Sequence, residues 1–80
     1  HKIRNPEKVA LKIVEFIMKK DRGILEKFYG CEVEDGDSVY DVFLAIGKKK
    51  GWLLKGGFVD EDRCAIRIID DWQRGRVGLK

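Results

Sequence analysis

The chain has 80 residues, of which 44% are hydrophobic and 39% are charged, so it makes one small domain with a single core, not a disordered protein. No stretch approaches the roughly 20 apolar residues of a membrane span, and no secretory signal pattern follows the N-terminus. We therefore expect a cytoplasmic protein. Neutral polar residues are scarce, with one serine, one asparagine, one glutamine and no threonine. Charge in their place is typical of heat-adapted proteins and predicts a melting midpoint well above about 50 °C.

The residue inventory disfavours most kinds of enzyme. The one histidine, His1, lies at the terminus, so neither a serine nor a cysteine nucleophile has a well-held histidine base. The two cysteines, Cys31 and Cys64, form no C-x-x-C pair and lack two further good zinc ligands. We expect both thiols to be reduced and structural, with no metal bound.

The glycine-rich segment over residues 47–57 does not match a nucleotide-binding loop. It lacks the lysine and the serine or threonine that end a Walker A loop, and no other GTPase motif is present in the chain. We therefore expect this chain to have no catalysis of its own and no bound nucleotide or other cofactor.

The first predicted helix follows Asn5 and Pro6, which look like an N-cap and a first-turn proline. Its helical pattern covers residues 9–18, and Gly23 is expected to close it. The apolar face is so wide that it needs cover on more than one side. That face contains Val9, Ala10, Ile13, Phe16 and Ile17, widened by Leu11, Val14 and Met18.

A second, short helix is predicted over residues 24–29, followed by an acidic loop over residues 31–37. A third helix begins at Ser38, whose spacing to Asp41 resembles a capping box, and it ends at Gly51. Its apolar stripe contains Val39, Val42, Phe43 and Ile46.

Residues 51–59 form a structured connection, because five of the nine are large and apolar. Gly56 and Gly57 predict a tight turn, which we expect to bring both Phe58 and Val59 onto the core.

The last predicted helix begins after an N-cap at Asp60 and closes at Gly75, leaving residues 76–80 as a tail. Its buried face contains Cys64, Ala65, Ile68, Ile69 and Trp72. No segment shows strand-like alternation. The sequence therefore predicts an all-α fold, a small bundle of about four helices.

Positive charge is concentrated in the second half of the chain. Residues 1–46 carry eight basic and nine acidic residues, a net charge of −1, whereas residues 47–80 carry nine and five, a net charge of +4. A basic segment beside an aromatic residue is typical of a protein that binds nucleic-acid phosphates. The candidate RNA-binding residues are Lys48, Lys49, Lys50, Lys55, Arg63, Arg67, Arg74 and Arg76.

The same charges have a simpler interpretation, which stays open at this point. Lysines at the end of a helix offset its dipole. Arg67 can pair with Asp71, and Arg74 with Asp70, at a spacing of four residues, which would make the arginine stripe a ladder of surface ion pairs. Both tryptophans fit a core better than they fit a stacking surface.

The stretch from Ala45 to Arg76 resembles the C-terminal end of the circularly permuted ribosome-assembly GTPases, the YlqF/RbgA group and the nucleostemin relatives. The family pattern is close to Gly-Gly-x-x-Asp, then Ala, then Asp-aromatic-x-x-Gly-Lys/Arg. The matching positions are Gly56, Gly57, Asp60, Ala65, Asp71, Trp72, Gly75 and Arg76.

This resemblance implies a helical, ANTAR-like C-terminal domain that helps to place a GTPase on ribosomal RNA of the maturing large subunit. Residues 1–80 would then be a single domain, the C-terminal fragment of a larger GTPase whose missing N-terminal domain holds GTP and Mg²⁺. Pre-large-subunit particles and that GTPase domain are the partners the resemblance implies, with no membrane.

Our leading hypothesis is a non-catalytic rRNA-binding accessory domain that contacts RNA phosphates through the basic segment. The alternative is a protein-interaction module that packs on its GTPase domain or on a ribosomal protein. That alternative predicts exposed apolar area on the first helix, for example at Leu11, Val14 and Met18. A DNA-binding helical domain is a third hypothesis, although no helix-turn-helix spacing is clear.

Overall fold

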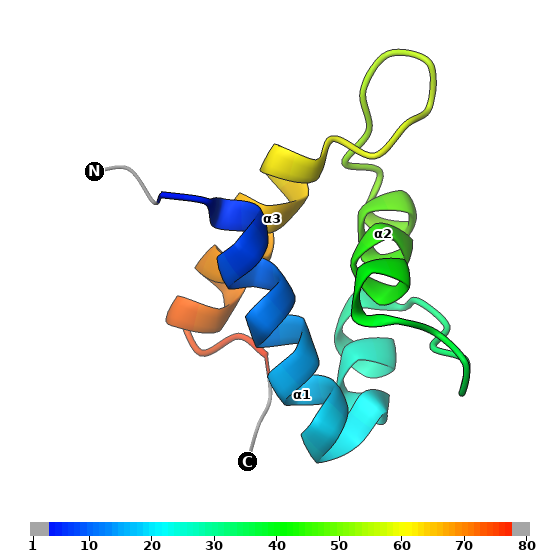
Figure 1. Cartoon of the computed structure of the whole chain (residues 1–80), viewed down its shortest axis with the longest axis vertical. Helices are drawn as coiled ribbons and strands as arrows, with labels where there is room; N and C mark the ends of the chain where they lie inside the picture. The colour runs from blue at the N-terminus through cyan, green and yellow to red at the C-terminus, as the bar shows by residue number, and fades with distance from the viewer. Residues whose placement is uncertain (1–3, 78–80) are drawn as a thin grey trace.

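The computed structural model describes residues 4–77, which form an all-α domain of three helices (Figure 1). In chain order they are α1 (Pro6–Tyr29), α2 (Val39–Lys50) and α3 (Glu61–Gln73). The long helix α1 packs against both of the others. The predicted all-α class is confirmed, with three helices where about four were expected. No helix among the described residues has the length and apolarity that a membrane crossing needs.

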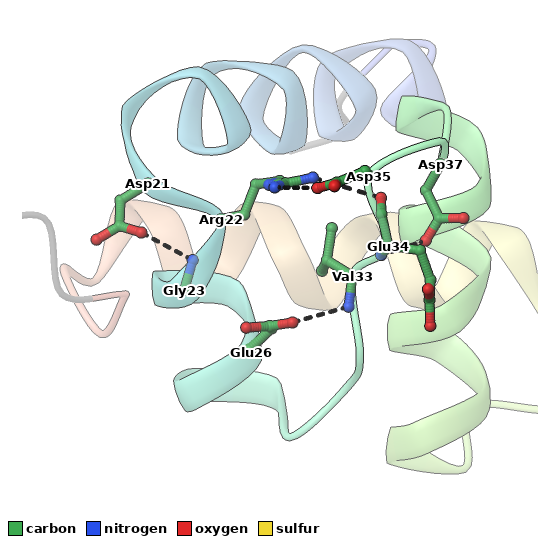
Figure 2. Close-up of polar contacts among 8 residues, drawn as sticks. All are labelled: Asp21, Arg22, Gly23, Glu26, Val33, Glu34, Asp35 and Asp37. Atoms are coloured by element: carbon green, nitrogen blue, oxygen red, sulfur yellow. Dashed lines mark hydrogen bonds and ion pairs between the residues drawn. The ribbon is translucent and has the colours of Figure 1, made fainter.

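The helix count differs because the first two predicted helices are the two halves of a kinked α1. Asp21 is extended, with φ −170° and ψ 107°, inside an otherwise helical run. Its carboxylate accepts a hydrogen bond of 2.9 Å from the backbone N–H of Gly23, as an N-cap side chain does for a new helix (Figure 2). Gly23 therefore lies inside the second half of α1, and the prediction that it ends the first helix is wrong.

The kink is tied to the acidic loop that follows α1. Figure 2 shows Arg22 reaching across to this loop, where Nη2 lies 2.6 Å from Oδ1 of Asp35 and Nη1 donates to the carbonyl of Glu34 at 3.4 Å. From the second half of α1, Glu26 accepts a hydrogen bond of 3.0 Å from the N–H of Val33. Exposed ion pairs add little stability, so these contacts mainly fix the path of the loop.

All three predicted N-cap positions are confirmed, and at two of them the side chain makes the cap hydrogen bond. The reciprocal capping box of Ser38 and Asp41 is present at α2. Asp60 caps α3 by accepting a hydrogen bond of 3.2 Å from the N–H of Arg63. Asn5 differs: its side chain makes no cap hydrogen bond, and its backbone is left-handed with φ 55°, a conformation that asparagine tolerates better than most residues.

The core joins apolar residues from all three helices. Its largest fully buried side chains are Phe43, Ile17, Leu25, Ile46, Ile68, Val14, Val42 and Cys64. Val9 and Phe16 were expected in this core but are 37% and 45% exposed. They lie seven residues apart on one flank of α1, and Phe16 packs edge-on against Trp72 with ring centroids 5.7 Å apart.

The connection between α2 and α3 closes as a short hairpin with one antiparallel bridge, Leu53 to Val59. Gly56 and Gly57 have φ of 98° and 90°, which confirms the predicted turn. Val59 is buried as expected, but Phe58 is 76% exposed. The prediction that Phe58 packs on the core is wrong, because neighbouring side chains in an extended segment point to opposite faces.

The chain after α3 turns back onto the core. Gly75 is left-handed with φ 69°, and the N–H of Arg76 donates to the carbonyl of Asp71 at 2.9 Å, as in a Schellman motif. Val77 is buried. The predicted tail therefore begins with two ordered residues, and residues 78–80, like His1, lie outside the described part of the chain.

Both cysteine thiols are free and buried, and burial raises the pKa of each, that of Cys64 to about 12. The thiolate is the reactive species. We therefore expect iodoacetamide to alkylate Cys31 and Cys64 very slowly in the native chain and rapidly once urea unfolds it. Mass spectrometry after timed quenching measures this. A native protein alkylated as fast as the unfolded one, or an unfolded chain that needs reductant before it reacts, would contradict the expectation.

Candidate functional site

All eight predicted RNA-binding residues lie on the surface of the domain. Lys48, Lys49 and Lys50 form the last turn of α2, and Lys55 is at the turn of the hairpin. The four arginines come from α3 and from the segment that follows it. Within residues 4–77, none of the four lysines takes part in an ion pair.

Three of the eight residues meet at one pocket of about 250 Å³, which we call the Trp52 pocket. Lys50 comes from the end of α2, Arg67 from the middle of α3 and Arg76 from the segment after α3. The pocket is lined by Phe28, Tyr29, Lys50, Trp52, Arg67, Asp70, Asp71 and Arg76. The fold thus gathers cations that are up to 26 positions apart in sequence.

Arg67 does not make the ion pair with Asp71 that its spacing predicts. Its guanidinium carbon lies 5.7 Å from the centroid of the Trp52 ring, a cation–π distance. Asp71 instead accepts a hydrogen bond of 2.8 Å from the hydroxyl of Tyr29 and lies 3.3 Å from Nη1 of Arg76. Within the described part of the chain, Arg67 has no carboxylate partner within ion-pair distance, and its side chain is exposed.

The other predicted pair, Arg74 with Asp70, is present, with Nε 2.9 Å from Oδ1. The hydrogen bond from Arg74 holds the pKa of Asp70 below its ordinary value, with further lowering by the charges of Arg74, Arg76 and Arg67. Arg76 also lies 3.7 Å from Asp70. The charges of Arg74 and Arg76 are therefore largely offset by acids, which leaves Lys50 and Arg67 as the cations available to a ligand at this pocket.

Tyr29 lines the Trp52 pocket and was not predicted as a site residue. Burial raises the pKa of its hydroxyl, and the hydrogen bond to Asp71 raises it further. The hydroxyl therefore stays protonated as a donor to Asp71 and joins the end of α1 to the end of α3. Its place as the last residue before Gly30 was visible in the sequence, but nothing local showed that it would meet a carboxylate 42 residues away.

The remaining arginine, Arg63, lies one helical turn before Arg67, and the two line a shallow surface depression with Asp60, Asp62 and Ile66. Lys48, Lys49, Lys55 and Arg74 line neither this depression nor the Trp52 pocket. Of the eight residues, the structure therefore brings together only Lys50, Arg67 and Arg76 at the Trp52 pocket, and Arg74 and Arg76 are already paired with acids.

The tryptophans are structural, as the simpler interpretation predicted. Trp52 is only 8% exposed beneath Arg67, and Trp72 is half-buried against Phe16. Among residues 4–77, no three histidine, cysteine or carboxylate side chains lie close enough to hold a metal ion.

The chain is similar to one segment of several GTP-binding proteins, although no protein-family model matches it. It is 37% identical over 76 residues, 95% of its length, to a GTP-binding protein of Methanocaldococcus jannaschii. It is 33% identical to nuclear/nucleolar GTPase 2 of Arabidopsis thaliana and 29% identical to ribosome biogenesis GTPase A of Bacillus cereus, again over 95% of its length. The chain spans only 20%, 13% and 25% of these three relatives.

Proposed function

We propose that the chain is an rRNA-binding accessory domain. The premise is that it belongs to the family of GTP-binding ribosome biogenesis proteins, as a homologue of one segment of those proteins. In the whole protein, a GTPase domain outside this chain would bind GTP and Mg²⁺. The segment described here would hold that enzyme on ribosomal RNA of the assembling large subunit.

The observation that carries this proposal is the convergence of Lys50 and Arg67 at the Trp52 pocket. Arg67 lacks a carboxylate partner within residues 4–77, and its planar guanidinium is held against Trp52. A guanidinium fixed in this way can take a phosphate by two parallel hydrogen bonds. Lys48 and Lys49 extend the positive surface along the last turn of α2.

The proposed contacts are to the RNA backbone. The last turn of α2 and the surface of α3 around Arg67 both present long basic side chains. Such side chains fit phosphates and the shape of a folded RNA better than they fit base edges. Affinity should therefore depend steeply on salt, because each phosphate contact releases condensed counterions.

The alternative function, a protein-interaction module, predicts exposed apolar area on α1, and that area lies at Val9 and Phe16 instead of at the three residues named for it. Val14 is fully buried, and Leu11 and Met18 are half-buried against the core, so these three residues do not form an exposed apolar patch. The interaction module remains the outcome to which a failed RNA-binding experiment would point.

The proposal predicts that the chain binds fragments of large-subunit rRNA and prefers them to duplex DNA. The measurement is fluorescence anisotropy with labelled RNA across a salt series, with unlabelled duplex DNA as competitor. We expect the logarithm of the affinity to fall linearly with the logarithm of the salt concentration, with a slope of roughly −0.7 to −0.9 for each phosphate contact.

Two results would contradict this proposal. If no RNA binds at about 50 mM salt, where phosphate contacts are strong, the lysines serve solubility, and the next partner to offer is the GTPase domain of a relative. If duplex DNA competes as well as rRNA does, the domain recognises phosphate charge alone, as the DNA-binding hypothesis requires.

A further inference from the structure

The hairpin between α2 and α3 is held firmly at its base and presents its tip to solvent. The N–H of Asp60 donates to the carbonyl of Trp52 at 2.8 Å, and the N–H of Leu54 donates to the carbonyl of Phe58 at 2.7 Å. A further hydrogen bond of 3.0 Å, from the N–H of Gly57 to the carbonyl of Leu54, closes the turn. Figure 1 shows this segment standing clear of the helices.

The tip carries the most exposed aromatic ring of the described chain. Phe58 is 76% exposed and Leu54 is 53% exposed. Apart from the adjacent residues of the chain, nothing lies within 4 Å of where a side chain at Gly57 would begin, and at Gly56 only the Phe58 ring comes within that distance. A ligand can therefore approach the backbone and the ring together.

The environment of Phe58 sets it apart from the other exposed aromatic residues. Phe16 packs against Trp72, Phe28 against Tyr29 and Tyr40 against Phe43, and each ring has its aromatic neighbour within 6.2 Å. Within residues 4–77, Phe58 belongs to no such pair. Burial therefore does not account for a phenylalanine at this position, whereas it accounts in part for the others.

The charge around the tip indicates what could bind there. No acidic residue occurs from Val42 to Val59, a stretch that contains Lys48, Lys49, Lys50 and Lys55. Lys55 is next to Leu54 in the turn itself. A flat apolar ring that follows a basic stretch is complementary to an unpaired nucleotide, whose base stacks on the ring while its phosphate meets a nearby lysine such as Lys55. The first acid after the ring, Asp60, accepts a hydrogen bond from the N–H of Arg63 as the cap of α3. An apolar protein groove gains nothing from the four lysines.

We infer that Phe58 is a stacking platform for an unpaired base of the RNA that the basic surface holds by its phosphates. This inference rests on the proposed function and refines it: the ligand is RNA with a loop or bulge, not a continuous duplex. The hairpin tip, with Leu54, Lys55 and Phe58, then contacts the unpaired nucleotides of the RNA, and the helix surfaces bind the adjacent phosphate backbone.

The test compares two RNAs of equal length, a stem–loop with a wide unpaired loop and a fully paired duplex. Phe58→Ala should weaken binding of the stem–loop by roughly 5- to 150-fold, with duplex binding and the salt slope unchanged. Phe58→Trp should retain or improve affinity because it keeps a flat ring. Phe16→Ala, which removes an exposed phenylalanine from α1, is the matched control and should leave both affinities as they are.

Phe58→Leu separates stacking from simple apolar contact, since leucine fills a pocket of similar size but has no ring face. We expect Phe58→Leu to bind as weakly as Phe58→Ala. If Phe58→Leu binds the stem–loop as well as wild type does, the inference is overturned, because apolar contact and not base stacking then accounts for the affinity. If wild type binds RNA with a steep salt dependence and Phe58→Ala binds the stem–loop equally well, the inference fails while the proposed function stands. If wild type binds neither RNA, both fail.

Discussion

Reversal of Lys48, Lys49 and Lys50 to glutamate should abolish RNA binding while the three-helix fold survives. These side chains are exposed, and within the described residues they make no ion pair, so little native structure depends on them. The change replaces three positive charges by three negative ones beside the Trp52 pocket, where Lys50 and Arg67 face the proposed phosphates. Each lost phosphate contact should reduce the salt slope by roughly one unit.

The fold needs a separate check in this variant, because acids at the end of a helix oppose its dipole by about 0.3–1 kcal/mol each. Circular dichroism and urea unfolding report on that cost. A triple change of the same lysines to glutamine removes the charges without adding acids and should still weaken binding strongly. The matched control is Lys8→Glu with Lys12→Glu and Lys19→Glu, an equal change of charge on exposed positions of α1.

The control triple should keep most of the affinity for rRNA, since those lysines lie outside the basic segment. If both triples lose binding equally, net charge and not a defined site governs the interaction. If neither does, the last turn of α2 is not part of the interface, and the simpler interpretation of these lysines as dipole-offsetting charges holds.

The sequence predicts the helices well where one local signal decides the outcome. The capping box at Ser38 and the cap at Asp60 mark helix starts that the structure confirms, because a side chain three residues from its partner needs no tertiary help. The predicted break in the first helix is two residues away from the observed kink in α1, because the position of this break does depend on tertiary contacts. Asp21 and Gly23 both interrupt helices, and which one does so depends on Arg22 and the acidic loop packing across them.

The candidate site is harder to predict because it is a tertiary property. Spacing correctly paired Arg74 with Asp70 but also suggested Arg67 with Asp71. Asp71 is taken by Tyr29 from α1, and no pattern within α3 could reveal that competition. The basic segment was visible in the sequence, whereas its focus around Trp52 follows from the way the ends of α1, α2 and α3 meet.

Phe58 shows the same limit at the level of one residue. Two glycines predicted the turn correctly, and hydrophobicity alone then placed both Phe58 and Val59 on the core. The alternation of side chains in an extended segment allows only one of the two neighbours to point inward, and Val59 is that residue. The alternation expected of an extended segment, applied to the two residues that follow the Gly56–Gly57 turn, was the signal that could have predicted an exposed phenylalanine.

Replacement of Gly47 by valine should lower the free energy of unfolding by about 3 kcal/mol, near the upper end of typical overpacking costs. Gly47 is buried in α2, where glycine itself costs a helix about 1 kcal/mol relative to alanine. A Cβ at this position would lie 2.6 Å from Cγ1 of Val59 and 3.3 Å from Sγ of Cys64. The absence of a side chain is what lets the base of the hairpin and the start of α3 lie against α2.

Urea unfolding of a double-mutant cycle with Val59→Ala tests this mechanism. Removal of the two Val59 methyl groups makes room, so Gly47→Val should cost at least about 1 kcal/mol less in the Val59→Ala background than in wild type. Gly36→Val is the control, because nothing lies within 4 Å of a Cβ there, and it should change stability by less than about 0.5 kcal/mol. Equal costs in both backgrounds would mean that the contact with Val59 is not the reason for glycine. Valine is no worse than glycine as a helix former. A large loss of stability that disappears when Val59 is truncated would therefore come from the close contact between α2 and the base of the hairpin.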